Sequence, residues 1–235
     1  MVRLKRETYS RISDVAGRWA STITIGLTTE RGMQMFSGIY SGMHRRYPEA
    51  VFQPVEANVE QQTRLLDSGQ LDLGFQTICE RRYKHFQYER ILEEPFVLCV
   101  PNSHPLAHHQ PYEQGFPSIS LRHFRNDLFT LVKKTSTMRE AVDRLFEQEG
   151  FRPRLLFESV GMRSMQRLAE CDECCCIIPR YYAIPSEHVS YFLLEGRPGW
   201  ELCEVHLQGH HLNKAARDLI EAARSYWHEH PYSPR

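Results

Sequence analysis

Short apolar segments alternate with longer amphipathic ones along this sequence, and this alternation is the feature that most constrains its fold. Residues 22–27 form an apolar run of strand length. After it, apolar residues recur at helical intervals from Met33 to Tyr47, and Pro48 then ends the helix. Three further elements continue the pattern, namely a strand over 51–55, a helix over 59–67 and a strand over 71–75. Strands and helices in this order predict a parallel sheet with right-handed crossovers.

The second half of the chain shows the same alternation after the apolar run 96–100. Five predicted elements follow this run: strand 128–132, helix 137–149, strand 155–157, helix 162–169 and strand 174–178. Residues 189–194 and 202–207 have strand character, and Asn213 can cap a last helix that reaches Trp227. We therefore predict an α/β protein with two Rossmann-like lobes joined by a two-strand hinge, and a ligand between the lobes.

Four short motifs in a fixed order carry a resemblance to a known family. They are Ile23-Thr-Ile-Gly-Leu-Thr-Thr29, Gln70-Leu-Asp-Leu-Gly-Phe75, Glu94-Pro-Phe-Val-Leu-Cys-Val-Pro101 and His104-Pro-Leu-Ala107. Their order resembles the effector-binding domain of LysR-type transcriptional regulators. The resemblance implies a fold like that of type 2 periplasmic binding proteins. It divides the chain into lobe I (21–100 plus 203–235), lobe II (101–202) and a remnant of a linker helix (1–20).

The chain departs from the family pattern in two places. A Gly-x-Gly pair usually precedes the strand that here ends in Ile177-Ile-Pro-Arg180, but Asp172 and Cys174 occupy those positions, so the turn should be shaped differently. The family's winged helix-turn-helix does not occur in the sequence. Lys plus Arg and Asp plus Glu number 29 each, so no overall positive field attracts this chain to DNA. DNA contact is expected only through a domain that is missing from this chain.

Candidate ligand-binding residues occur where predicted strands end and helices begin. They are Thr28, Thr29, Asn58 and Thr77 in lobe I, and Thr135, Ser136, Thr137, Arg139, Gly161 and Met162 in lobe II. The resemblance supports Thr77, which matches a family ligand position. Each helix start favours an anion by about 0.3–1 kcal/mol, and Arg139 can pair with a carboxylate. The predicted effector is an organic acid, an amino acid or an oxyanion. Taken singly, these residues also fit plain helix caps, and Arg139 fits a solvated side chain.

Four of the seven cysteines fall within residues 171–176 and invite a redox or metal interpretation. A second ligand pair at suitable spacing is missing, and Cys175 and Cys176 belong to a strand that should enter the core. We therefore favour packing over redox sensing and metal binding, and predict neither a metal nor a cofactor. The histidines of the segment 206–211 are expected to be solvated.

The sequence favours a regulatory domain over an enzyme or a transport protein. It has no Gly-x-Ser-x-Gly elbow, no glycine-rich phosphate loop and no His-Glu-x-x-His pair. A free-standing solute-binding protein of a transporter would share the fold, but it would need export, and no signal sequence is present. A cysteine-based redox sensor or enzyme is a lesser alternative. We expect a cytoplasmic protein without membrane contact. The resemblance implies a homodimer or tetramer, for which helices 33–47 and 138–149 are candidate contact surfaces.

Overall fold

The computed structural model describes residues 22–108, 115–159 and 161–231. The predicted helix over residues 2–19, with the linker remnant 1–20, lies outside these residues. The described chain divides into two compact units, one formed by residues 22–92 and 201–230 and the other by residues 93–200. Strands β4 (Phe86–Pro101) and β10 (Gly199–Leu207) each begin in one unit and end in the other. The chain therefore crosses between the units twice.

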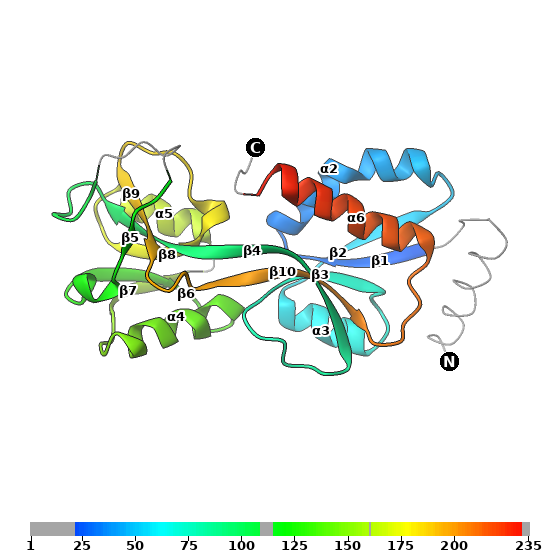
Figure 1. The fold of residues 1–235 in the computed structure, drawn as a ribbon, viewed down its shortest axis with the longest axis horizontal. Helices are drawn as coiled ribbons and strands as arrows, with labels where there is room; N and C mark the ends of the chain where they lie inside the picture. The colour runs from blue at the N-terminus through cyan, green and yellow to red at the C-terminus, as the bar shows by residue number, and fades with distance from the viewer. Residues whose placement is uncertain (1–21, 109–114, 160, 232–235) are drawn as a thin grey trace. The chain divides into compact units, whose positions relative to one another are not determined.

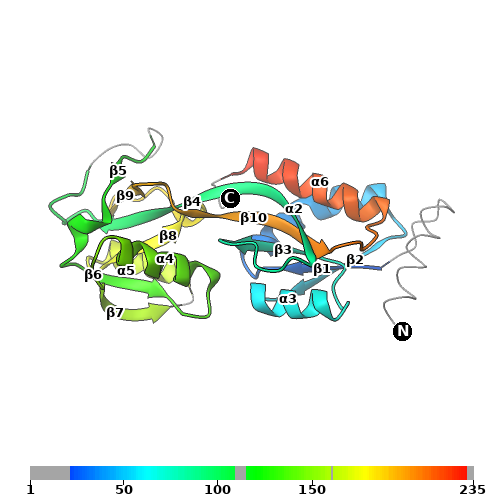
Figure 2. The same ribbon diagram turned by 60° about the horizontal axis from the view of Figure 1, so that its bottom comes forward.

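Unit 1 contains a sheet with the strand order β2 (Val51–Glu56), β1 (Thr22–Leu27), β3 (Leu73–Ile78) and β10. The pairs β1–β2 and β1–β3 are parallel, whereas β10 runs antiparallel to β3. Helices α2 (Arg31–Arg46) and α6 (Lys214–Glu229) cover one face of this sheet, and α3 (Val59–Asp67) covers the other (Figures 1 and 2). The core under α3 consists of apolar side chains that include Leu66, Ile78 and Val205.

Unit 2 contains a sheet with the strand order β4, β8 (Cys175–Pro179), β6 (Leu128–Val132) and β7 (Arg154–Ser159). On its other side β4 pairs with β9 (Val189–Leu194), and β9 pairs with β5 (Ser118–Ile119). Strand β4 therefore has a partner on both sides, and every residue of its run 96–100 is 0% exposed. Helices α4 (Thr137–Gln148) and α5 (Met162–Glu170) lie on opposite faces of the sheet (Figure 1).

The α/β class predicted from the sequence is confirmed, and most predicted elements agree with the observed ones to within about three residues. Strand β3 is informative, because it runs to Ile78 rather than ending at Phe75. Its antiparallel neighbour β10 pairs Ile78 with Glu201 and Thr77 with Leu202. Thr77 was predicted to follow the strand, and this prediction was wrong. It lies inside the strand because pairing with β10 continues past the end of pairing with β1.

The turn after α5 explains how the chain accommodates a departure from the family pattern. Asp172 has a φ of +62°, which is the left-handed region that favours glycine. Aspartate is one of the few side chains that tolerate this region. The Ser103 hydroxyl donates a hydrogen bond of 2.7 Å to Asp172 Oδ1. Asp172 therefore adopts a backbone conformation that glycine favours, and its side chain accepts a hydrogen bond from Ser103.

Candidate functional site

In unit 1, Thr28 begins the connection from β1 to α2. Its Oγ1 accepts a hydrogen bond of 3.2 Å from the Gly32 N–H, and its carbonyl accepts one of 3.2 Å from the Met33 N–H. The Thr28 side chain is half-buried, whereas Thr29 is exposed. The hydroxyl of Thr28 therefore serves the first turn of α2, at the carboxyl edge of the sheet.

Asn58 is the N-cap of α3 at the neighbouring strand end. Its Oδ1 accepts a hydrogen bond of 2.9 Å from the Gln61 N–H, and Gln61 Oε1 accepts one of 3.0 Å from the Asn58 N–H. This reciprocal pair is a capping box. The Ala57 N–H donates to the Leu27 carbonyl at 2.9 Å, so the ends of β1 and β2 are joined. Thr28, Thr29 and Asn58 consequently occupy one edge of unit 1.

In unit 2, the two candidate segments also lie at adjacent strand ends. Ser136 Oγ accepts a hydrogen bond of 3.3 Å from the Met138 N–H and caps α4. Thr135 is exposed, and Thr137 is the first residue of α4. Gly161 precedes Met162, the first residue of α5, and the Gly161 N–H donates to Ser159 Oγ at 3.1 Å.

The two segments are joined by backbone as well. The Lys133 N–H donates to the Ser159 carbonyl at 3.0 Å, which connects the first residue after β6 to the last residue of β7. The structure therefore brings Thr135, Ser136 and Thr137 to the same edge of unit 2 as Gly161 and Met162.

Arg139 is buried, because only 5% of its surface is exposed. Its Nη1 donates to the Val132 carbonyl at 2.8 Å and contacts Glu158 Oε1 at 2.5 Å, and its Nε contacts Asp143 Oδ1 at 2.7 Å. The hydrogen bond from Arg139 lowers the pKa of the Glu158 carboxyl. The guanidinium thus joins α4 to β6 and β7, which corrects the solvated alternative. Its role toward a ligand stays a prediction.

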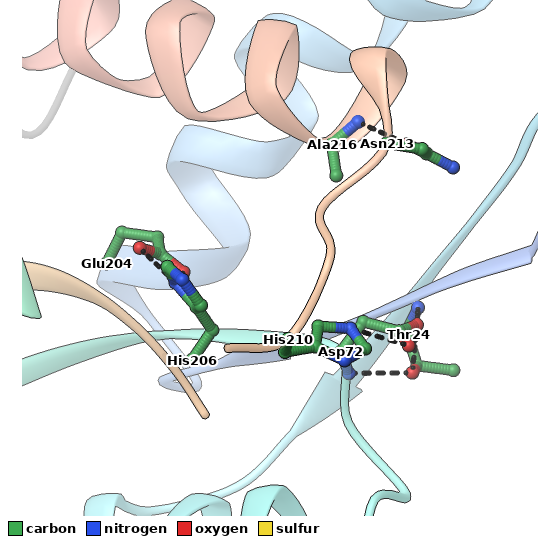
Figure 3. A network of polar contacts seen from close by, with 7 residues as sticks. All are labelled: Thr24, Asp72, Glu204, His206, His210, Asn213 and Ala216. Atoms are coloured by element: carbon green, nitrogen blue, oxygen red, sulfur yellow. Dashed lines mark hydrogen bonds and ion pairs between the residues drawn. The ribbon is translucent and has the colours of Figure 1, made fainter. Parts of the chain in front are cut away.

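His206 of β10 and His210 of the following loop are not solvated either, and their partners were not predicted from the sequence (Figure 3). Glu204 is 0% and His206 is 6% exposed, and His206 Nδ1 lies 3.0 Å from both carboxylate oxygens of Glu204. His210 Nε2 lies 3.8 Å from Asp72 Oδ1, and Asp72 Oδ2 accepts two bonds of 2.7 Å from Thr24. Residues two apart on a strand lie on the same face, so the spacing of Glu204 and His206 was the available signal for their contact. Cys203 and Val205 on the opposite face are buried as well.

We expect Glu204→Gln to remove part of the pH dependence of stability. Burial raises the pKa of the Glu204 carboxyl, although His206 opposes the shift. The folded protein then holds this proton more tightly than the unfolded chain does. The corresponding stability is complete below the unfolded pKa of about 4.3 and is lost as the pH rises through the raised folded pKa.

Urea unfolding at a series of pH values measures this effect. The stability of Glu204→Gln should rise relative to the wild type as the pH increases through this window. The exposed residue Glu49 provides the control, and Glu49→Gln should follow the wild type at every pH. Parallel curves for Glu204→Gln and the wild type would contradict the expectation.

The clustered cysteines differ sharply in exposure. Cys171 is exposed, whereas Cys174, Cys175 and Cys176 are 4%, 2% and 0% exposed. Burial raises the pKa of the Cys175 thiol, so this side chain remains a neutral thiol in the core. No three His, Cys, Asp or Glu side chains in the described part of the chain are grouped to hold a metal ion. Likewise, no helix in the described ranges is long and apolar enough to cross a membrane.

Comparison with known proteins identifies the family. Residues 16–227 match the family model of the LysR substrate binding domain, so the match covers most of the chain. The chain belongs to this LysR family. An uncharacterized HTH-type transcriptional regulator, YybE of Bacillus subtilis (strain 168), is 27% identical over 136 residues, which are 58% of this chain and 44% of that protein. The chain spans less than half the length of the curated relatives it matches.

Solved LysR effector-binding domains have the same fold. The BenM effector binding domain with its effector benzoate has a TM-score of 0.70 at 17% identity, over 92% of this chain and 96% of that one. The effector binding domain of QuiR in complex with shikimate has a TM-score of 0.69 at 17% identity, over 89% and 98%. The predicted LysR-like fold, of the type 2 periplasmic-binding-protein class, is thereby confirmed.

Proposed function

We propose that this chain is the ligand-sensing domain of a LysR-type transcriptional regulator and that it binds a small organic anion. The family match carries the proposal, since the curated relatives are transcriptional regulators rather than transport proteins or enzymes. Two structural neighbours are complexes with benzoate and shikimate, and both of these ligands carry a carboxylate. In this proposal the protein catalyses no reaction, and DNA is contacted by a domain outside this chain in the cytoplasm.

The candidate residues at the carboxyl edge of each unit support an anionic ligand. In unit 1 the edge carries the starts of α2 and α3, and in unit 2 it carries the starts of α4 and α5. Helix starts present backbone N–H groups and the positive end of the helix dipole to an anion. We propose that Thr28, Thr29, Asn58 and Thr77 contribute ligand contacts from unit 1. Thr135, Ser136, Thr137, Gly161, Met162 and Arg139 contribute them from unit 2.

The mechanism we propose is a population shift. An anion that contacts one arrangement of the domain more favourably than another shifts the equilibrium toward that arrangement. The attached DNA-binding domains then respond to the ligand through this coupling. The buried thiols at Cys175 and Cys176 give little support to the redox alternative, because a buried neutral thiol reacts slowly.

We expect Thr28→Ala and Thr135→Ala each to lower the affinity of the domain for its effector. A hydrogen bond to a charged group contributes about 1.5–3 kcal/mol, so each change should reduce affinity roughly tenfold to a hundredfold. A thermal-shift screen of organic acids, amino acids and oxyanions would find the ligand, because a ligand at 100 times its Kd adds about 2.7 kcal/mol of stability. Calorimetry with that ligand then measures the variants.

The matched control is Thr22→Ala. Thr22 is exposed and begins β1, so it lies at the opposite end of the strand from Thr28. Its replacement should leave the affinity unchanged. Unchanged affinity in both Thr28→Ala and Thr135→Ala would remove the assigned residues from the binding site.

We also propose that the domain pairs with a second copy through the edge strand β7. Leu155, Leu156 and Phe157 of this strand are 41%, 39% and 46% exposed. Strand β7 is the terminal strand of its sheet and pairs with β6. Covering exposed apolar side chains on an edge strand with another chain removes apolar surface from water, which favours pairing at such an edge.

Sedimentation of the wild type and of Phe157→Lys tests this pairing. We expect the wild type to form a dimer. We expect the dissociation constant of the Phe157→Lys dimer to be at least tenfold higher. Leu106→Lys is the control, because Leu106 is 40% exposed and lies outside the helices and strands. A wild type that stays monomeric, or equal dimerisation of all three proteins, would contradict the pairing.

A further inference from the structure

Two buried glutamine side chains in unit 1 face the same spot between α3 and the sheet. Gln62 of α3 is 0% exposed, and Gln76 of β3 is 3% exposed. Gln62 Nε2 donates to the Ala57 carbonyl at 2.9 Å, which fixes the orientation of this amide. Within the part of the chain that the structure describes, Gln62 Oε1 and Gln76 Nε2 have no hydrogen-bond partner. One buried acceptor and one buried donor are therefore left unsatisfied.

Two glycines leave room for the Gln62 amide against the sheet. Gly26 of β1 and Gly74 of β3 are partners in the strand register. A Cβ added at Gly74 would lie 2.7 Å from Gln62 Oε1 and 3.7 Å from Gln76 Nε2. A Cβ added at Gly26 would lie 2.9 Å from the same Gln62 oxygen. The Gln62 acceptor and the Gln76 donor therefore both lie close to Gly74, where a side chain would collide with the Gln62 amide.

This point adjoins the candidate effector-binding edge of unit 1. Gly26 and Gly74 are the last partners in the β1–β3 register, and Thr28 and Gln76 each follow two residues later along their own segments. Gln62 lies one helical turn after Asn58, and its N–H donates to the Asn58 carbonyl at 2.9 Å. Thr28 Oγ1 and Asn58 Oδ1 already accept hydrogen bonds from helix N–H groups. Gln62 Oε1 and Gln76 Nε2 are an acceptor and a donor that a ligand could satisfy.

We propose that Gln62 and Gln76 together bind a hydroxyl group of the effector, which places the effector among hydroxylated organic acids. This inference rests on the proposed function. A hydroxyl can donate to Gln62 Oε1 and accept from Gln76 Nε2 at the same time. A carboxylate has no proton to donate, and an ammonium group has no lone pair to accept. A site built for a hydroxyl rejects the analogue that lacks it, because its buried polar groups then stay unpaired.

The test compares acids that differ by one hydroxyl group. Three probe pairs are suitable: 4-hydroxybenzoate with benzoate, lactate with propionate, and malate with succinate. Calorimetry gives the affinity of each acid for the wild type, Gln76→Met and Gln53→Met. Methionine keeps the length of the glutamine side chain but removes the N–H donor. Gln53 is the matched control, because it is an exposed glutamine on β2 of the same sheet.

We expect at least one hydroxylated acid to bind the wild type and Gln53→Met tenfold or more tightly than its partner. In Gln76→Met the difference should fall below twofold. Gln76→Met without ligand should be at least as stable as the wild type, because it loses an unsatisfied donor.

Three results would overturn the inference. The first is equal binding of the two members of every pair, which leaves the proposed function intact. The second is an unchanged hydroxyl preference in Gln76→Met together with a lower stability of this variant. Such a loss of stability would indicate that a structural water satisfies Gln76 in the free protein. The third is the absence of binding by any acid, which overturns the proposed function as well.

Discussion

Replacing Gly199 by alanine should destabilise the protein by about 3 kcal/mol or more, which is at or beyond the usual range for overpacking. A Cβ at this position would lie 2.2 Å from the Glu94 carbonyl oxygen and 2.9 Å from Pro95 Cα. Both atoms belong to the backbone of β4, so no side-chain rotation relieves the clash. The strands would have to separate, although the Phe96 N–H donates to the Pro198 carbonyl at 2.8 Å.

Denaturant unfolding followed by circular dichroism measures this effect. The matched control is Gly42→Ala, because a Cβ at Gly42 meets nothing within 4 Å. Gly42 lies in α2, where alanine is favoured over glycine by up to about 1 kcal/mol, so the control should be neutral or more stable. If Gly199→Ala unfolded at the wild-type denaturant concentration, the close approach of β4 and β10 would be disproved.

Replacing Glu94 by leucine should cost roughly 2–5 kcal/mol of stability. Glu94 is 1% exposed, and its carboxylate accepts hydrogen bonds from the Tyr181 N–H at 2.7 Å and the Trp200 Nε1–H at 2.5 Å. Leucine has a similar volume but no acceptor, so two buried donors lose a bond at about 1–3 kcal/mol each. Glu94→Gln retains one carbonyl oxygen and should fall between leucine and the wild type.

The same unfolding measurement applies, with tryptophan fluorescence as a second signal because Trp200 loses a direct contact. Glu147→Leu is the control, since Glu147 is exposed on α4. It should change the stability by less than about 0.5 kcal/mol. Equal stabilities of Glu94→Leu and Glu94→Gln would show that the acceptor oxygens do not matter.

Both residues lie where the chain passes between the units, at Leu92–Glu93 and Trp200–Glu201. Glu94 begins one of the motifs that carried the family resemblance, and the structure gives this position a physical role. Its carboxylate connects β4 to Trp200 at the start of β10 and to Tyr181 after β8. A motif residue that sequence comparison associates with the family is here a buried hydrogen-bond acceptor.

The sequence alone determined most of the elements and several of their ends, because hydrophobic periodicity and capping act over a few neighbouring residues. The bounds of β1, α3, β6 and β9 follow from local pattern, and so does the cap of α6, where Asn213 Oδ1 accepts from the Ala216 N–H at 2.9 Å. Such contacts span three or four positions, and a local pattern contains all of the participants. The candidate residues at helix starts were found for the same reason.

Only the tertiary structure decided which distant residues became partners. Strand β10 extended β3 past Thr77, although Thr77 and its partner Leu202 are far apart in the sequence. Packing of separate elements paired Arg139 with Glu158, and it buried the neighbouring residues Glu204 and His206. The convergence of Gln62 and Gln76 on Gly74 required a helix and a strand to pack together. These pairings depend on burial and strand register, which arise when separate segments meet and which no single segment encodes.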